Sequence, residues 1–301
     1  MGTFMAEHAK IGFIGVGNMG WPMASCLVQA GHTLNVSDYR RIQAENFAQQ
    51  MGGTAPDTLG ELAAASDILI TMLPTSAAVG SVLDSIGSSL RPGTVIVDMT
   101  SGVPAETKAL AARVAELGGV MIDAPVSGGV SRAKTGQLAI MVGGPEDVIA
   151  RVRPVLEAMG NSITRTGDVG SAHAMKALNN LVSDGGFLIG IEALLIGQRF
   201  GLDPALMVDV LNASTGMNNS SQKKFRQFVL SRKFDSGFGL DLMLKDLTIA
   251  LGVARDTKTP VPFSSLCREL SAAAAAMLGA GADHTELAKI SERLVGEELL
   301  G

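Results

Sequence analysis

A lysine and two asparagines stand inside a strongly apolar stretch in the middle of the chain. The segment "AMKALNNL", residues 174–181, opens the longer run "AMKALNNLVSDGGFLIGIEALLIG". At about 3.6 residues per helical turn, Lys176, Asn180 and Ser183 fall near one line. A buried lysine is unfavourable unless it is paired or deprotonated, and a deprotonated amine can exchange a proton with a substrate. The stripe is therefore either catalytic or the solvated edge of a surface helix.

A second chemical signal is the glycine pattern near the start of the chain. In "IGFIGVGNMG", Gly15, Gly17 and Gly20 follow an apolar strand and have the spacing G-x-G-x-x-G. The pattern provides a tight turn, a close backbone approach and close helix packing, so that a pyrophosphate can sit at the helix N-terminus. The alternative is a glycine-rich turn in an unrelated α/β fold.

The end of the next expected strand bears on the choice of dinucleotide. Asp38 lies 18 residues after Gly20 and can bind the ribose hydroxyls of NAD. Its charge repels a 2′-phosphate and favours NAD. Arg40 and Arg41 follow at once and can instead bind that phosphate, so NADP stays open. The alternative for the two arginines is a solvated helix start.

Two further segments carry polar groups beside apolar ones. In "DAPVSGG", residues 123–129, the hydroxyl of Ser127 and the N–H groups of the next two glycines can form a nest for a carboxylate. Arg132, five residues past Ser127, is expected to help choose the substrate. In "GFGLDLMLKDLTIA", Lys245 and Asp246 lie in a largely apolar helix. The alternative for residues 123–129 is an ordinary glycine turn, and that for Arg132 is a solvated side chain. For Lys245 and Asp246 it is an exposed polar strip of a helix.

The chain alternates short apolar runs with helical patterns in its first half and is helical afterwards. This predicts an α/β fold: a doubly wound parallel sheet of the Rossmann type at residues 1–168, then an all-helical domain at 169–301, joined by a long helix. Strands are expected at 10–15, 33–38, 67–73, 94–100, 119–126, 138–144 and 162–167. Helices are expected at 19–30, 40–51, 75–90, 104–117, 145–159, 170–198, 203–213, 220–231, 239–256, 262–279 and 283–298.

Composition excludes several classes of protein. The 301 residues are 47% hydrophobic and 18% charged, with a net charge of −5 and no basic run, so nucleic acid is not an expected partner. Two distant cysteines form no disulfide or metal-ligand spacing. The head "MGTFMAEHAK" lacks the features of a signal peptide, and the apolar runs are too short or interrupted to span a bilayer. A cytoplasmic protein is expected. Its apolar helices indicate a homo-oligomer, a dimer or tetramer.

Taken together, these four segments resemble the β-hydroxyacid dehydrogenase family, that of 3-hydroxyisobutyrate dehydrogenase, tartronate semialdehyde reductase and glyoxylate/succinic semialdehyde reductase. "GFIGVGNMGWPMA" resembles its cofactor signature, and Asp123 to Leu138 its substrate motif. Lys176 with the two asparagines resembles its catalytic motif, and "KDL" its C-terminal motif. The resemblance covers nearly the whole chain in the family's order and implies a C-terminal domain of the 6-phosphogluconate dehydrogenase-like kind.

The resemblance implies a role for each matching position. Lys176 is the catalytic acid/base, and Asn180 holds the substrate beside it. The implied substrate-binding residues are Ser127, Gly128, Gly129, Phe238 and Asp246. The implied cofactor-binding residues are Gly15, Val16, Gly17, Asn18, Met19, Gly20, Asp38, Tyr39, Arg40, Leu73, Pro74, Ser101 and Lys245. The chain departs from the family pattern at Cys26, Ala78 and Ala172, and none of these removes a proposed catalytic group.

The function implied is hydride transfer between a nicotinamide cofactor and a small 3-hydroxy acid or its semialdehyde. Lys176 takes the hydroxyl proton, which requires a lowered lysine pKa such as burial produces. One alternative is imine reduction on the same fold, whose members commonly lack the lysine. Others are a nucleotide-sensing protein without turnover and a sugar-phosphate dehydrogenase, for which the chain is short.

Overall fold

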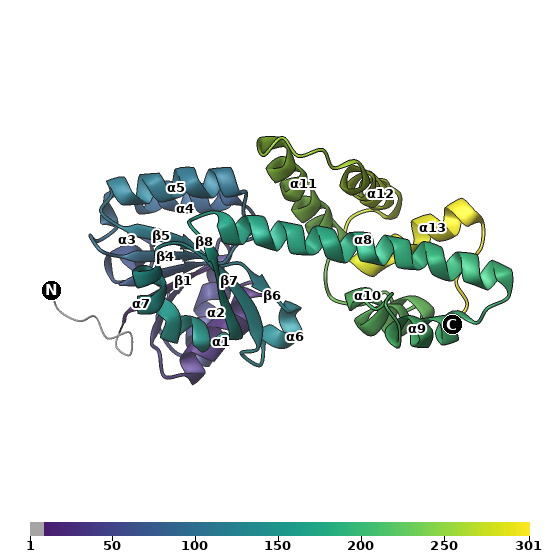
Figure 1. Ribbon diagram of the computed structural model, residues 1–301. Coiled ribbons are helices and arrows are strands. Elements are labelled where there is room, and N and C mark those ends of the chain that lie inside the picture. Colours follow the sequence, from purple (N-terminus) through teal and green to yellow (C-terminus); the bar gives the residue numbers. More distant parts are fainter. Residues whose placement is uncertain (1–8) are drawn as a thin grey trace. The chain divides into compact units, whose positions relative to one another are not determined.

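The computed structural model describes residues 9–301 and divides into two compact units, residues 1–176 and 177–301. Figure 1 shows an α/β unit followed by a unit built from helices. The domain boundary expected at 168/169 stays a prediction. Most of the head in which no signal peptide is expected, residues 1–8, lies outside the described residues. The cytoplasmic location likewise stays a prediction.

A mostly parallel sheet forms the centre of the first unit, which confirms the expected fold. The strand order is β2-β1-β3-β4-β5-β7-β6, with β8 paired to β7. The first five strands are parallel and buried, and their last residues are in register, from Ser37 through Ile14, Thr71 and Asp98 to Asp123. Their bounds are β1 Ile11–Ile14, β2 Leu34–Ser37, β3 Ile68–Thr71, β4 Val95–Asp98 and β5 Val120–Asp123.

Helices cover both faces of this sheet because the central strands β1, β3 and β4 are buried on both sides. One core contains side chains of α1 (Gly20–Gln29), α2 (Arg41–Met51) and α7 (Glu146–Glu157). The other contains side chains of α3 (Leu59–Ala64), α4 (Ser76–Ile86) and α5 (Pro104–Glu116). Figure 1 shows α4 and α5 on one side and α1 and α2 on the other. Of these six helices, only α3 lacks a counterpart in the expectations from sequence, and a further short helix at residues 129–133 was not expected either. The Thr58 hydroxyl caps the start of α3 by accepting the Glu61 N–H.

The sheet is mixed at the edge that follows β5. The expected single strand at 119–126 is instead β5 and the two-residue strand β6 (Val126–Ser127), since Pro125 lacks the N–H that a continuing ladder needs. The short helix α6 (Gly129–Ala133) leads to β7 (Leu138–Gly143), which is antiparallel to both β5 and β6 and parallel to β8 (Gly160–Gly167).

The start of the long helix α8 (Ser171–Phe200) is fixed by a buried aspartate of the sheet. Asp123, the last residue of β5, accepts the N–H of Gly170 at 2.7 Å and that of His173 at 2.9 Å. The first N–H groups of a helix have no partner within the helix, and a negative charge there is favourable. The sheet therefore sets where α8 begins.

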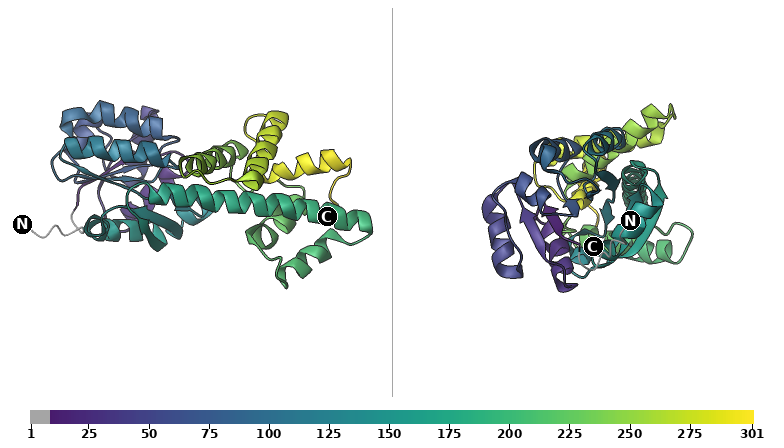
Figure 2. Two further views of the ribbon diagram at one scale, coloured as in Figure 1. Left: turned by 45° about the horizontal axis from the view of Figure 1, so that its top comes forward. Right: turned by 90° about the vertical axis from the view of Figure 1, so that its left-hand side faces the viewer.

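The second unit consists of helices arranged along α8. Figure 2 shows α11 and α12 on one side of α8, and Figure 1 shows α9 and α10 on the other. The bounds are α9 Pro204–Asn212, α10 Asn219–Lys223, a π-helical turn Phe225–Leu230, α11 Leu240–Asp256, α12 Pro262–Leu278, a 3₁₀ turn His284–Leu287 and α13 Ala288–Val295. The expected helix at 220–231 is thus divided between α10 and the π-helical turn.

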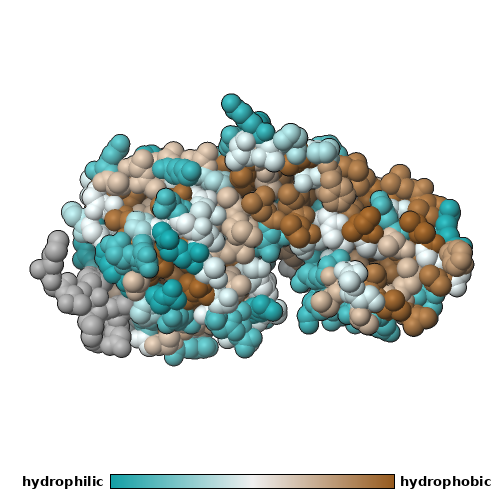
Figure 3. Space-filling view, in the orientation of Figure 1, coloured by the Kyte–Doolittle hydropathy of each residue, from teal (hydrophilic) through white to brown (hydrophobic). Residues whose placement is uncertain are grey.

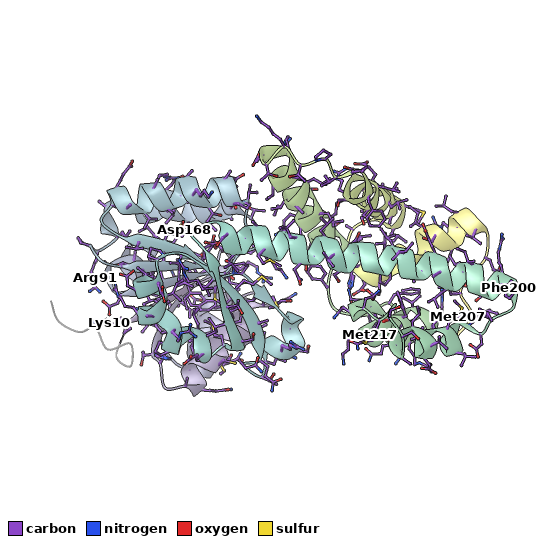
Figure 4. All side chains as sticks on the ribbon, viewed as in Figure 1. Lys10, Arg91, Asp168, Phe200, Met207 and Met217 are labelled. Carbon is purple, nitrogen blue, oxygen red and sulfur yellow. The ribbon has the colours of Figure 1, made fainter. Side chains whose placement is uncertain are left out.

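Length and composition alone would let α8 cross a membrane, but 56% of its most apolar window is buried inside the protein. That burial is typical of a core helix. Small residues on α8 admit close neighbours: a methyl group at Gly190 would lie 2.4 Å from the Phe225 ring, and one at Gly197 would lie 2.2 Å from the Met207 sulfur. Figure 4 marks Met207 and the helix end at Phe200.

Candidate functional site

A cavity of about 710 Å³ opens at the carboxyl ends of β1, β2 and β3, where the strand order reverses. Open α/β sheets bind ligands at this point. The cavity brings together ten of the predicted cofactor residues: Gly15, Gly17, Asn18, Met19, Gly20, Asp38, Tyr39, Arg40, Leu73 and Pro74. It also contains residues that the sequence argument did not assign to the cofactor, among them Asp57, Leu59, Ser81 and Val82. Ala78, singled out only as a departure from the family pattern, lines it as well.

The three glycines of the loop have the separate roles that the spacing predicts. Gly15 has φ +98°, and a methyl group on it would lie 2.3 Å from the Met72 carbonyl oxygen. A methyl group on Gly20 would lie 1.8 Å from the Gly15 carbonyl oxygen. Gly17 faces open space, because a methyl group on it would have no neighbouring atom within 4 Å. No side chain caps the start of α1, so its first N–H groups suit a pyrophosphate.

Asp38 occupies the position expected for a ribose ligand. Its carboxylate accepts the Val16 N–H at 3.1 Å and the Arg40 N–H at 3.0 Å, and its side chain is 5% exposed. Val16 is itself buried and supports Asp38 through its backbone. The Arg40 guanidinium lies 3.9 Å from the carboxylate and over the Tyr39 ring, whereas Arg41 is paired with Glu45 and Asp57.

The proposed carboxylate anchor lies between β6 and α6. Ser127 ends β6, and Gly128 and Gly129 have φ angles of +135° and +66°, which favour glycine. The Gly129 backbone is exposed and unobstructed. A methyl group on Gly128 would meet the Arg132 side chain at 2.6 Å, so Arg132 folds back over the loop.

The lysine and asparagine of the opening motif are buried on α8, with Lys176 8% exposed and Asn180 7% exposed. Helical spacing places them one turn apart. The Asn180 side chain donates to Asp246 at 2.6 Å and accepts from Asn179 at 3.2 Å, so its orientation is fixed. The alternative of a solvated helix edge is therefore wrong for these two side chains. Asp246 is buried on α11, beside Lys245, whose Nζ atom lies 3.7 Å from the carboxylate.

Phe238 lies just before α11 and is held by a neighbouring histidine. Its carbonyl oxygen accepts the His284 N–H at 2.8 Å and lies 3.2 Å from His284 Nδ1, and the two rings meet edge to face. Burial, and after it the positive charge of Lys224, lowers the pKa of His284 to about 4, so the imidazole is neutral near pH 7. Phe238 is therefore positioned by a network that its sequence motif does not reveal.

Two expected cofactor residues are not among those that line the dinucleotide cavity. Ser101 follows β4, and Lys245 belongs to the helical unit. His173, which follows the departure at Ala172, is buried, and its Nδ1 atom lies 2.7 Å from the Thr107 hydroxyl. The sequence argument did not assign Asp123 its role at the start of α8, although the residue begins the substrate motif.

Comparison with known proteins agrees with this geometry. Residues 10–167 match the family described as the NAD binding domain of 6-phosphogluconate dehydrogenase, and residues 170–291 that described as NAD-binding of NADP-dependent 3-hydroxyisobutyrate dehydrogenase. A 2-(hydroxymethyl)glutarate dehydrogenase of Eubacterium barkeri is 36% identical over 300 residues, covering 99% of each chain. A 2-hydroxy-3-oxopropionate reductase of Escherichia coli (strain K12) is 37% identical over 295 residues, covering 96% of this chain and 99% of that one.

A solved structure is similar over the same extent. The 3-hydroxyisobutyrate dehydrogenase of Mycobacterium tuberculosis, described with L-serine, has a TM-score of 0.88 and 31% identity, covering 94% of this chain and 99% of that one. The matches span both units and include each of the four motifs. The chain therefore belongs to the 3-hydroxyisobutyrate dehydrogenase family of NAD(P)-dependent 3-hydroxyacid dehydrogenases.

Proposed function

We propose that this oxidoreductase interconverts a small 3-hydroxy acid and its semialdehyde, with Lys176 as the group that exchanges the proton. The observation that carries the proposal is the burial of Lys176 and Asn180 one turn apart on a largely apolar helix. Burial among apolar groups favours the neutral amine, which is the form that accepts a proton. Membership of the dehydrogenase family supports the same role.

The chain's own groups account for the proton and for the orientation of the substrate. During oxidation, Lys176 accepts the proton of the 3-hydroxyl as the hydride leaves C3; a bound nicotinamide supplies the redox chemistry. During reduction, the Lys176 ammonium returns the proton to the aldehyde oxygen. One N–H of the Asn180 amide is held by Asp246, which leaves the other to donate to the substrate oxygen. The Ser127 hydroxyl and the two glycines after it bind the carboxylate.

We propose NAD as the preferred cofactor and keep NADP as the alternative. The Asp38 charge lies at the cavity, is engaged by two backbone N–H groups and is disfavoured beside a 2′-phosphate. Arg40 is the nearest cation, because Arg41 is occupied by two carboxylates.

We further propose a homo-oligomer that assembles through the helical unit. Apart from Met175, the exposed large apolar residues of α8 are Leu178, Val182, Ile189, Ile196 and Phe200, and Val182 and Phe200 are 75% and 84% exposed. At about 100° per residue these five fall within about 40° of one line along the helix. Figure 3 shows hydrophobic surface gathered over this unit. A continuous apolar ridge of this length is typical of a protein interface.

Replacing Lys176 with alanine should lower kcat by roughly 10² to 10⁴, since a positioned proton donor contributes about that much. NADH affinity should be unchanged, because Lys176 is not among the residues that line the cofactor cavity. Lys176→Arg should fare no better, as a guanidinium keeps its proton near neutral pH. Asn180→Ala should lower kcat by a smaller factor than Lys176→Ala. Steady-state kinetics and NADH titration check this; a Lys176→Ala enzyme with more than about a tenth of wild-type kcat contradicts the role.

The cofactor proposal predicts a larger kcat/KM with NAD than with NADP at equal concentration. Asp38→Ser removes the repelling charge and should shift the ratio toward NADP by about tenfold, equivalent to about 1.4 kcal/mol. Arg40→Ala should reduce the remaining NADP activity, and Arg41→Ala serves as the control because its side chain is paired elsewhere. A wild-type preference for NADP would show that Arg40 determines the choice.

For the oligomer, light scattering at micromolar concentration should give at least twice the 31.1 kDa mass of one chain. Val182→Glu together with Ile196→Glu should lower that mass, because two charges would then lie on the ridge. Glu192→Gln, on the same helix, is the control. A monomeric wild-type protein would refute the proposal.

A further inference from the structure

Lys224 is a partly buried cation of the helical unit that no carboxylate neutralises directly. It lies between α10 and the π-helical turn, and its Nζ atom donates to the Ser183 hydroxyl at 3.1 Å. The Phe187 ring lies 6.0 Å from the same atom. Among residues 9–301, no carboxylate lies within ion-pair distance of it. Such an ammonium suits an anionic ligand.

The two carboxylates that influence Lys224 from a distance have other partners. Asp184 is 1% exposed and accepts the Ser271 hydroxyl at 3.2 Å. Asp283 accepts the Ser236 hydroxyl and the N–H groups of Gly237 and Thr285. Burial raises the pKa of Asp184 to about 7, so it carries only part of a negative charge near neutral pH.

The ammonium itself keeps its charge. Burial lowers the pKa of Lys224 to about 8, and Asp184 and Asp283 oppose that shift. At pH 7 the protonated form therefore predominates. A ligand carboxylate beside the ammonium would act as its counter-ion. The contact would be a charge-assisted hydrogen bond, which is stronger than a neutral one.

Lys224 is connected to the proposed substrate site by two independent routes within the helical unit. Ser183, its hydrogen-bond partner, lies three residues after Asn180 on α8, a rise of about 4.5 Å on the same side of the helix. Phe187, whose ring lies 6.0 Å from the ammonium, contacts the ring of His284, and His284 holds Phe238. Both neighbours of Lys224 thus lead to residues of the substrate site.

We propose that Lys224 binds a second carboxylate, so that the preferred substrate is a dicarboxylic 3-hydroxy acid. The inference rests on the proposed function, in which Asn180 holds the reacting end. In a glutarate branched at C2, the distal carboxylate lies four bonds from the hydroxyl-bearing carbon, about 5 Å when extended. That reach matches one turn of α8, from Asn180 to Ser183 and the ammonium beside it.

The test measures binding to the protein saturated with NAD, by calorimetry, so that turnover is not required. The probes are 2-methylglutarate and 2-methylpentanoate, which share a carbon skeleton and differ in the second carboxylate. Wild-type protein should bind 2-methylglutarate at least about tenfold more tightly, and Lys224→Met should remove that difference. Lys224→Met should leave 2-methylpentanoate binding within about threefold of wild type.

The neighbouring exposed Lys223 provides the matched control, and Lys223→Met should keep the wild-type preference. Arg132→Ala tests the other cation near a substrate loop. Thermal melting establishes that each variant is folded. A preference that survives Lys224→Met, or that disappears in Arg132→Ala instead, overturns the proposal, as does a wild-type protein without preference.

Kinetics separate this inference from the proposed function. Wild-type kcat/KM should be higher for 2-(hydroxymethyl)glutarate than for 3-hydroxyisobutyrate, and Lys224→Met should lower the first through KM. Selective 2-methylglutarate binding with no turnover of either compound would retain the Lys224 site and refute the dehydrogenase activity proposed for it. Turnover of 3-hydroxyisobutyrate with equal binding of the two probes would retain the dehydrogenase activity and refute the Lys224 site.

Discussion

The Asp123 carboxylate is the interaction on which the arrangement of the proposed active site depends. It ends β5 and accepts two backbone N–H groups at the start of α8, at 2.7 and 2.9 Å. Lys176 follows only three residues after His173, the second of these donors, so its place relative to the sheet is set at this contact. Asp123 also begins the loop that carries Ser127 and the two glycines. One buried residue thus fixes the origin of the helix that carries Lys176 and begins the loop of the proposed carboxylate anchor.

Two further constraints build on this contact. The register of the first five strands aligns their carboxyl ends, and the glycine loop leaves an uncapped helix start open to a pyrophosphate. Along α8, one apolar part of the surface packs against its neighbours, while two of the buried polar side chains have defined partners. Asn180 is held by Asp246, and Asp184 by Ser271. The helix is therefore both a core element of the fold and the carrier of the buried polar residues of the proposed site.

Much of the fold follows from local patterns in the sequence. Strands such as "VIVD" are short and continuously apolar because they are covered on both faces, and the structure places them within a few residues of their expected bounds. The tight contacts of Gly15 and Gly20 and the burial of Lys176 follow from physical reasons, and the structure confirms them. The break at Pro125 was foreseeable from its missing N–H, but the antiparallel pairing of β7 was not, because pairing direction depends on contacts distant in sequence.

The site was less accessible from sequence where its residues act through tertiary contacts. Asp123, Lys224 and His284 carry no local signal, since their roles arise from partners between 41 and 50 residues away. Leu59, the first residue of α3, and Val82, within α4, likewise line the dinucleotide cavity only through the packing of the folded chain. Motifs identified the groups for which we propose chemical roles, whereas the groups that position them became visible only in the folded chain.

The most direct test of this account is kcat for Asp123→Asn, measured beside its thermal stability. The asparagine oxygen can accept only one of the two N–H groups, and its amide opposes the other, so unfolding should become easier by about 2 kcal/mol. A shift of α8 by about 1 Å should lower kcat by about 10²-fold. The matched control is Asp98→Asn, because Asp98 lies in register with Asp123 on the neighbouring strand β4. The Asp98 carboxylate accepts hydrogen bonds from the Thr71 hydroxyl and the Thr100 N–H, and it lies 3.9 Å from His173 Nε2 on α8. The account predicts a kcat loss in Asp123→Asn well beyond that in Asp98→Asn, with NAD affinity unchanged in both; wild-type kcat in a destabilised Asp123→Asn enzyme would contradict it.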